Sequence, residues 1–559
     1  MQIESVLANL KGCLRSEDEM SSNQYDVVIV GAGFAGLYML HRVLATGRTV
    51  RVLEQASDVG GTWYFNRYPG ARCDAESLAY SYSFSSDLEQ DWTWSERYAQ
   101  QPEILAYARH VADRFDLRRH IDFDSRVASA VWDEPQGAWV VATSQNQILQ
   151  AKVCIMATGC LSVPRRPDID GLEHFSGNFY QASQWPTEPV NFKDQRVGLI
   201  GTGSSGIQAV PVIASEADEL TVFQRTPNFS VPAHNKVLDA DWVDAFKKRY
   251  AEHRENHRQG IGSGFGDLAV LPQAGPIDPV LFESLTEDQA NSILEAAWER
   301  GGARFMGAIG DTLMNPVANA FVQNFVHQKI KRLVRDPETA TALCPSNHPI
   351  GTRRICVDSN YYETYNLPHV RLVNLRKDPI VKITELGVQL RSEHVALDTL
   401  VIATGFDAMT GALLSMNVMG PEGFTLAEAW SEGPKTYLGL MAHGFPNLFM
   451  ITGPGSPSVL SNMMVSIEQH VDFVMGCLEF MGDRDHQRVE PSAESQSGWM
   501  QHVQEVANST LFPKGGSWYL GANVPGKPRV FMPYAAGVGP YRLACDAVAK
   551  AGYRGFEFA

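Results

Sequence analysis

Residues 26–36 read Asp-Val-Val-Ile-Val-Gly-Ala-Gly-Phe-Ala-Gly, and this stretch decides the expected fold. An apolar run typical of a buried parallel strand leads directly into three glycines with Gly-x-Gly-x-x-Gly spacing: Gly31, Gly33 and Gly36. A helical pattern follows, and a second apolar run at 51–53 ends in Glu54. This order of strand, glycine turn, helix, strand and acid predicts a dinucleotide-binding βαβ unit.

Each part of this unit has a distinct task. Gly31 allows the tight turn, Gly33 lets a pyrophosphate approach the backbone amides, and Gly36 lets the helix pack closely on the sheet. Glu54 can accept a hydrogen bond from a ribose hydroxyl.

A second copy of the pattern follows. An apolar run at 197–200 leads into Gly201-Thr202-Gly203-Ser204-Ser205-Gly206-Ile207, a helix, and another apolar run at 220–223. Gly31 and Glu54 are 23 residues apart, and so are Gly201 and Gln224. Two glycine turns with the same spacing predict an α/β protein with two Rossmann-like dinucleotide-binding domains.

The second strand ends differently from the first. Gln224 stands in place of the acid, and Arg225 and Thr226 follow it. Loss of the carboxylate removes repulsion of a 2′-phosphate, which a guanidinium can grip with two hydrogen bonds. The first unit therefore suits FAD or NAD, and the second suits NADP.

The rest of the chain fits between and after these units. Residues 239–341 have helical periodicity, so we expect a mostly helical insertion there. His253 and His257 lie four apart within it, a spacing compatible with a metal, but the charged residues around them favour a solvated helix face. Strand-like runs end in Ala-Thr-Gly at 157–159 and 403–405, which suggests chain crossings between the domains.

The expected division follows from these features. It comprises an N-terminal extension (1–24), a first FAD-binding part (25–158), a first NADP-binding part (159–238), the helical insertion (239–341), a second NADP-binding part (342–400), and a second FAD-binding part with the C-terminal segment (401–559).

Composition narrows the function. The 559 residues include 47 Lys+Arg and 63 Asp+Glu, a formal charge of −16 that argues against a nucleic-acid partner. No apolar run is long enough for a membrane span, and the eight scattered cysteines fit reduced thiols in a cytoplasmic protein. The cysteines form no Cys-x-x-Cys pair to receive electrons from a flavin, and no metal site is predicted. Molecular oxygen remains as the acceptor, which indicates a monooxygenase or an NADPH oxidase.

Four longer motifs carry a family resemblance. Residues 61–74 read Gly-Thr-Trp-Tyr-Phe-Asn-Arg-Tyr-Pro-Gly-Ala-Arg-Cys-Asp, and residues 175–186 contain Phe175, Gly177, Gln181, Trp185 and a following proline. Together with residues 453–458 and 517–527, these motifs resemble the type I Baeyer–Villiger monooxygenases, close to the phenylacetone monooxygenase branch. The resemblance runs from about Tyr25 to the C-terminus.

The resemblance implies a reaction and a set of residues. NADPH reduces FAD, oxygen forms a C4a-peroxyflavin, and one oxygen atom is inserted beside a ketone carbonyl to give an ester or lactone. Arg354 matches the active-site arginine, and Asp74 matches the carboxylate that positions it. The positions matching FAD contacts are Gly31, Gly33, Phe34, Gly36, Glu54, Thr62, Trp63, Tyr64, Phe65, Tyr80, Val127 and Met463. Those matching NADPH contacts are Arg72, Cys73, Gly201–Ile207, Arg225, Thr226, Arg353 and Trp518. Asp74 and Arg354 are also expected among the cofactor-binding residues, and Val459 and Leu460 match the substrate side.

Gln181 is the departure from the family pattern, which has histidine at this position of the fingerprint. Glutamine can donate and accept hydrogen bonds, but it does not titrate near neutral pH. We expect a structural role for this linker position. Two alternatives to ketone oxidation are a flavin monooxygenase acting mainly on sulfur or nitrogen, and an uncoupled NADPH oxidase or non-catalytic flavoprotein. The oligomeric state is not visible in the sequence.

Overall fold

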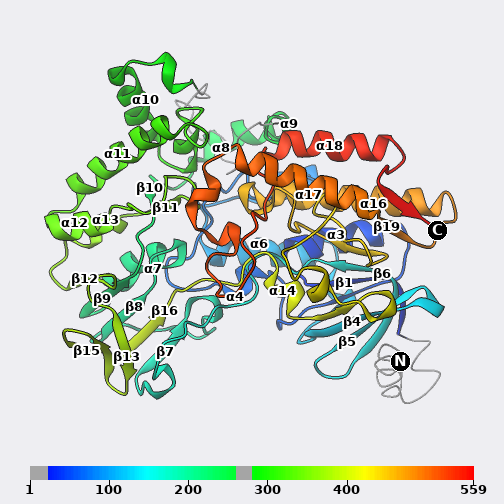
Figure 1. Ribbon diagram of the computed structural model, residues 1–559, viewed down its shortest axis with the longest axis horizontal. Helices are drawn as coiled ribbons and strands as arrows, with labels where there is room; N and C mark the ends of the chain where they lie inside the picture. Colours follow the sequence, from blue (N-terminus) through cyan, green and yellow to red (C-terminus); the bar gives the residue numbers. More distant parts are fainter. Residues whose placement is uncertain (1–22, 260–279) are drawn as a thin grey trace.

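The computed structural model describes residues 23–259 and 280–559. Two sheets lie side by side, with helices above and between them (Figure 1). The predicted N-terminal extension falls outside the described residues except for its last two. The predicted α/β fold with two Rossmann-like units is confirmed.

The first sheet is centred on the first glycine turn. Its strand order is β17-β4-β5-β6-β1-β2-β3, with β18 added along part of β6. Val27, Val28 and Ile29 in β1 are fully buried, because parallel strands on both sides and helices on the faces exclude water. The strands are β1 (Gln24–Val30), β2 (Val50–Leu53), β3 (Ile121–Asp122), β4 (Val127–Asp133), β5 (Ala138–Thr143), β6 (Ile148–Met156), β17 (Asn417–Met419) and β18 (Leu448–Met450).

The second sheet is entirely parallel, in the order β12-β9-β8-β16-β7. The expected boundary between 400 and 401 falls inside β16, so it is wrong by at least two residues. All four residues of β16 pair with both β7 and β8, which places the whole strand in this sheet. The strands are β7 (Asn178–Gln181), β8 (Arg196–Ile200), β9 (Glu219–Gln224), β12 (Val370–Asn374) and β16 (Thr399–Ile402).

The two glycine turns are built alike. Gly31 has φ +104°, and a Cβ there would lie 2.6 Å from the carbonyl oxygen of Ala157. Gly201 has φ +116°, and its Cβ would lie 2.4 Å from the oxygen of Ala403. The alanine of each Ala-Thr-Gly segment therefore packs against the first glycine of one turn, and only glycine has room at that turn position.

Helices cover the sheets. Helix α3 (Phe34–Leu44) follows the first turn and packs against α16 (Met463–Gly482), while α7 (Ser204–Ala214) follows the second turn. Other helices of the described chain are α4 (Thr62–Phe65), α5 (Ser86–Asp91), α6 (Gln101–Arg114), α13 (Tyr361–Thr364), α14 (Gly411–Leu414), α15 (Leu426–Ala429), α17 (Ala493–Asn508) and α18 (Val538–Lys550). Smaller strands are β10 (Ser230–Pro232), β11 (Cys356–Asp358), β13 (Ile380–Thr384), β14 (Gly387–Leu390), β15 (His394–Ala396), β19 (Val489–Pro491) and β20 (Phe556–Phe558).

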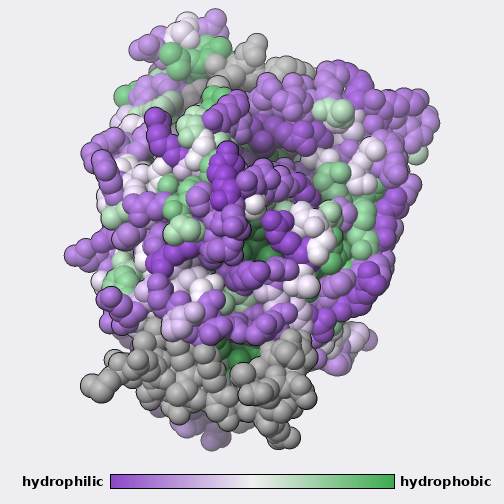
Figure 2. Space-filling view, turned by 90° about the vertical axis from the view of Figure 1, so that its right-hand side faces the viewer, coloured by the Kyte–Doolittle hydropathy of each residue, from purple (hydrophilic) through white to green (hydrophobic). Residues whose placement is uncertain are grey.

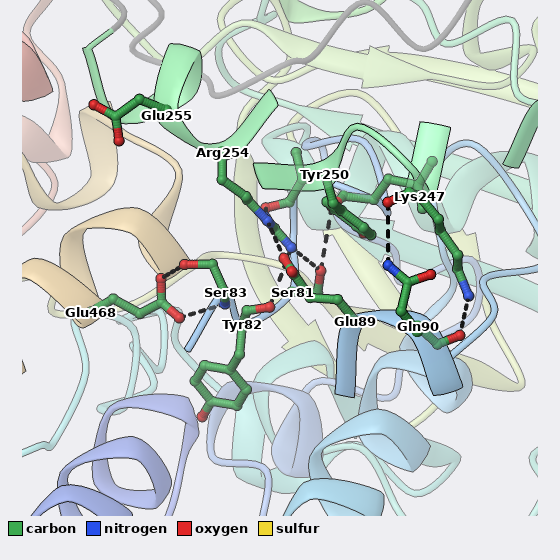
Figure 3. Close-up of polar contacts among 12 residues, drawn as sticks. Ser81, Tyr82, Ser83, Glu89, Gln90, Lys247, Tyr250, Arg254, Glu255 and Glu468 are labelled. Atoms are coloured by element: carbon green, nitrogen blue, oxygen red, sulfur yellow. Dashed lines mark hydrogen bonds and ion pairs between the residues drawn. The ribbon is translucent and has the colours of Figure 1, made fainter. Parts of the chain in front are cut away.

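Within the described parts of residues 239–341, which are 239–259 and 280–341, helices predominate and no named strand occurs. They include α8 (Ala240–Lys247), α9 (Tyr250–Gln259), α10 (Glu287–Arg300), α11 (Pro316–Leu333) and α12 (Pro337–Leu343). The expectation of a solvated face for α9 is wrong: Arg254 and His257 are buried, and the His253 ring stacks on Phe246 at 4.1 Å. Partners from distant segments make this burial possible, and Figure 3 shows Arg254 directed into them.

The surface matches the composition. The face in Figure 2 is largely hydrophilic, and its apolar residues form small patches. None of the helices in residues 23–259 and 280–559 combines the length and apolarity that a membrane span requires. In the same residues, no cluster of three or more His, Cys, Asp or Glu side chains is placed to hold a metal ion.

Candidate active site

The first glycine turn is tied to the end of β2. The buried Glu54 carboxylate accepts hydrogen bonds from the backbone N–H groups of Ala32 at 2.6 Å and Ala56 at 2.8 Å. A carboxylate has about four acceptor positions, so capacity remains for a ribose hydroxyl. The N–H of Ser125 donates to the Glu54 carbonyl oxygen at 2.7 Å, which brings Val127 to the same end of the sheet.

Aromatic residues predicted to contact the flavin meet beside this turn. The Trp63 indole donates to the Tyr80 hydroxyl at 3.1 Å, and the Tyr80 and Phe34 rings are T-shaped with centroids 5.9 Å apart. Asn462, which caps α16, donates to the Ala79 carbonyl oxygen at 2.8 Å, so Met463 begins its helix next to Tyr80. Thr62, Tyr64 and Phe65 lie on α4 with Trp63.

Asp74 and Arg354, 280 residues apart in the chain, form an ion pair. The Arg354 Nε atom lies 3.1 Å from Asp74 Oδ2, with the aspartate side chain 9% exposed and the arginine side chain 23% exposed. Burial is the largest single effect and would lower the pKa of Arg354. The charge and hydrogen bond of Asp74, together with Tyr519 and Cys73, outweigh it and raise the pKa, so the guanidinium stays positive. A fixed, partly accessible cation is suited to stabilising negative charge that develops on a reacting group.

The motif at 61–74 lies flush against the second unit. Gly70 has φ +76°, and a Cβ there would meet the Gln208 carbonyl oxygen of α7 at 2.4 Å. The Gln208 side chain accepts from the Tyr68 hydroxyl at 2.9 Å and donates to Asp74 Oδ1 at 3.3 Å. Helix α7, which starts at the second glycine turn, is therefore bonded directly to the ion pair.

Predicted substrate-side residues also reach the ion pair. The Arg354 Nη1 atom donates to the Val459 carbonyl oxygen at 3.1 Å. Val459 and Leu460 are buried in a mainly apolar cluster with Met409, Tyr519 and Phe531. The Tyr519 hydroxyl is buried without a hydrogen-bond partner among the described residues, as expected for a group that faces a ligand.

The second turn provides room for a cofactor. A Cβ at Gly206 would lie 2.1 Å from the Gly201 carbonyl oxygen, whereas a Cβ at Gly203 would meet nothing within 4 Å. Thr202 Oγ1 donates to the carbonyl oxygen of Thr226 at 3.0 Å, which fixes the turn to the end of β9. The turn residues Ser204, Ser205 and Ile207 begin α7. Arg72 and Cys73 directly precede Asp74, and the Arg72 carbonyl oxygen accepts a hydrogen bond from the Gln208 side chain at 3.1 Å.

Four arginines gather beyond the second turn. Burial and the charges of Arg225 and Arg376 lower the pKa of Arg353, and burial and Arg225 also lower the pKa of Arg165. Arg376 Nη2 lies 3.5 Å from Thr226 Oγ1. Within the described parts of the chain, no acidic side chain pairs with these four, so the cluster is suited to an anion such as a 2′-phosphate. Of these four, Arg225 and Arg353 are among the residues predicted from the sequence, whereas Arg165 and Arg376 are not.

The C-terminal segment covers this cluster. Arg353 donates to the carbonyl oxygens of Gly515 at 2.9 Å and Gly516 at 3.1 Å. Trp518 follows in the same segment and lies against Tyr519, with ring centroids 4.4 Å apart. The predicted NADPH contacts Arg353 and Trp518 are thus brought together with the substrate-side cluster.

The fingerprint at 175–186 lies at the edge of the second sheet. A Cβ at Gly177 would meet the Asp398 oxygen at 2.4 Å and the Phe175 ring at 2.6 Å. Gln181 ends β7, where it pairs with Ile402, and it borders a small recess shared with Ser205. Trp185 is buried against Tyr180 and Phe192. These contacts fit a linker that packs the edge strand.

Comparison with known proteins agrees with this geometry. Residues 28–258 match the family model described as pyridine nucleotide-disulphide oxidoreductase. The chain is 39% identical to a Baeyer-Villiger monooxygenase from Pseudooceanicola batsensis, over 95% of each chain. It is 37% identical to the methyl acetate-forming acetone monooxygenase from Gordonia sp. strain TY-5, over 96% of this chain and 99% of that one.

Solved structures give the same answer. An oxidized steroid monooxygenase bound to NADP superposes with a TM-score of 0.90 at 47% identity, covering 96% of this chain and 99% of the other. Sequence and structure agree over nearly the full length of both chains, and the chain therefore belongs to the flavin-dependent Baeyer–Villiger monooxygenases.

Proposed function

We propose that this enzyme uses NADPH and O₂ to insert one oxygen atom beside the carbonyl of an apolar ketone, with NADP⁺, water and an ester or lactone as products. The observation that carries the proposal is the Asp74–Arg354 ion pair, which contacts both α7 and the apolar cluster around Val459. When bound, FAD takes a hydride from NADPH and activates O₂ for transfer to the ketone.

The described residues fit both cofactors. The first turn, Glu54 and the aromatic group of Phe34, Trp63 and Tyr80 would hold FAD. The open space at Gly203 and the arginine cluster would hold NADPH. Arg354 would stabilise negative charge on the reacting oxygen atoms, and Asp74 would fix its orientation.

A labelled-oxygen experiment tests the reaction. The purified protein, NADPH and an aryl ketone are combined under ¹⁸O₂, and the expected product is an ester with one ¹⁸O atom, formed in equal amount to the NADPH consumed. Hydrogen peroxide without ester, for aliphatic, cyclic and aryl ketones alike, would contradict ketone oxidation. A parallel assay with a sulfide then separates heteroatom oxidation from an uncoupled oxidase.

Arg376 is expected to add selectivity for the 2′-phosphate. Arg376→Ala should raise the KM for NADPH about tenfold and leave the KM for NADH unchanged, since one charge-assisted contact is lost. The effect should shrink at high salt, because ions screen partly exposed charges. Arg371→Ala is the matched control, because its side chain pairs with Glu393 on the surface. An equal change for both cofactors would show that Arg376 does not contact the phosphate.

Gln181 is expected to serve as a structural linker residue. Its backbone is fixed in β7 against β16, so exchange for a titratable side chain should leave this pairing intact. Gln181→His should therefore change product formed per NADPH by less than about twofold at pH 6–9, across the range where histidine loses its charge. A large rise in coupling would show that protonation at this position takes part in the catalytic cycle.

A cytoplasmic location and action on a small-molecule substrate belong to the same proposal. The seven cysteines within the described residues are all free thiols, which fits a reducing compartment.

A further inference from the structure

Helix α9 of the helical segment 239–341 reaches a loop of the first unit that is far from it in sequence. This loop, which we call the Tyr80 segment, comprises residues 78–83. Figure 3 shows Tyr250 and Arg254 directed from α9 toward the segment, and Glu255 directed away from it. Arg254 and its partner Glu89 of α5 have side chains only 5% and 9% exposed, so this is a buried ion pair.

Arg254 holds both sides of Tyr80. Its guanidinium donates to Glu89 at 2.9 Å and to the carbonyl oxygens of Ala79 at 3.1 Å and Tyr82 at 3.3 Å. It also donates to the Ser81 hydroxyl at 2.6 Å. One side chain therefore donates hydrogen bonds to backbone carbonyl oxygens before and after Tyr80, which fixes the conformation of that residue.

Neighbouring side chains complete the attachment. The Tyr250 hydroxyl donates to the Leu78 carbonyl oxygen at 2.8 Å. Arg258 donates to the Ser83 hydroxyl at 2.7 Å, and the Ser83 N–H donates to Glu468 of α16 at 2.6 Å. Arg254 forms an ion pair with Glu89, while Arg258 and Glu468 both form hydrogen bonds with Ser83. The segment is therefore held between α9 and α16.

The opposite side of the segment faces the aromatic group predicted to contact FAD. Tyr80 accepts from the Trp63 indole, and the Tyr82 hydroxyl donates to the Phe34 carbonyl oxygen at 2.5 Å. The Tyr82 and Phe34 rings are also T-shaped, at 5.5 Å between centroids. Movement of the segment would therefore move Phe34, Trp63 and Tyr80 together.

We propose that Arg254 is a positioning residue for the flavin site, through which helix α9 holds the Tyr80 segment against FAD. The inference rests on the proposed function in one respect, the assignment of Phe34, Trp63 and Tyr80 to the FAD site. It extends that site to a helix outside the residues predicted to contact FAD, and it gives this part of the helical segment a role in flavin binding.

The test compares FAD binding by full-length variants. Arg254→Met removes every donor at nearly constant length, and we expect the dissociation constant for FAD to rise at least tenfold, with a changed visible spectrum of the bound flavin. Arg254→Lys should restore part of the affinity, because one cationic donor remains. Arg249→Met is the matched control: Arg249 is 62% exposed in a surface pair with Glu252, so FAD affinity should change less than twofold.

Ser81→Ala is the milder variant, since Arg254 keeps its other three acceptors. We expect a two- to fivefold weaker affinity for FAD and a small spectral change in this variant, even where Arg254→Met fails to fold. Unchanged FAD affinity and spectrum in a folded Arg254→Met protein, or in Ser81→Ala, would overturn the inference. FAD affinity is read without ketone, so a wild-type protein that binds FAD but makes no ester would contradict the proposed function alone.

Discussion

Replacing Arg354 with methionine is expected to abolish ester formation, lowering kcat/KM for the ketone by about 1,000-fold, or ~4 kcal/mol of transition-state stabilisation. The guanidinium is the permanent cation at the junction of the two units, and Asp74 keeps it charged and oriented. Methionine preserves the length of the side chain but supplies neither charge nor donor. The measurement is steady-state ester formation, with NADPH consumption and hydrogen peroxide followed in parallel.

Arg353→Met is the matched control for this experiment. Arg353 is adjacent in sequence, but it donates to Gly515 and Gly516 and lies in the arginine cluster. Its loss should raise the KM for NADPH while ester formed per NADPH stays close to the wild-type value. Retention of more than about a tenth of the ester-forming rate in Arg354→Met would show that the charge-stabilising group lies elsewhere.

Adding side-chain bulk at Gly206 is expected to eliminate productive NADPH binding. The first carbon of any side chain would lie 2.1 Å from the Gly201 carbonyl oxygen, closer than atoms can approach, so the turn must open. For Gly206→Val we expect the rate of flavin reduction by NADPH to fall at least ~100-fold, because the pyrophosphate loses its backbone donors. Bound FAD should be retained, since the first turn is unchanged.

Gly36→Val is the corresponding variant in the first glycine turn, and it is expected to affect FAD and not NADPH. Its Cβ would lie 1.8 Å from the Gly31 carbonyl oxygen, so this variant should lose FAD. Gly498→Ala in α17 is the neutral control, because a Cβ there meets nothing within 4 Å. Normal reduction of Gly206→Val by NADPH would contradict the assignment of the second turn to this cofactor.

The two-unit fold could be predicted from sequence because its deciding signals are local. The apolar runs at 27–30, 51–53, 197–200 and 220–223 lie in strands of the structure, β1, β2, β8 and β9 respectively. Their apolar residues are consecutive because both faces of a parallel sheet are covered. The strand at 399–402 was harder to divide between units, since its sequence does not show which neighbours it pairs with.

The missed site residues depend on topology. Arg376 follows β12 and Arg225 follows β9, and these strands are neighbours with Asn374 opposite Gln224. A signal existed, because residues just beyond the carboxyl ends of adjacent parallel strands converge, but it requires the strand order.

The error at α9 has a similar origin. A helix rich in charged residues is predicted to be solvent-exposed unless the partners of its charges are known. The acceptors of Arg254 lie about 170 residues earlier in the chain. Sequence alone gives no pairing between such distant charges and carbonyl oxygens. The buried arginine could therefore be recognised only after the two segments were placed side by side.

The pairing of β6 has a consequence for synthesis of the protein. Residues 148–151 of β6 pair with β5, whereas Cys154–Met156 pair with β18 along the same edge. β18 begins about 290 residues after β6 ends, so at roughly 5–20 residues per second it leaves the ribosome about 15–60 s later. During that interval the nascent chain carries an unpaired apolar strand edge, which is a template for association with other chains. Slow codons placed between these two strands would prolong the exposure, and fast ones would shorten it.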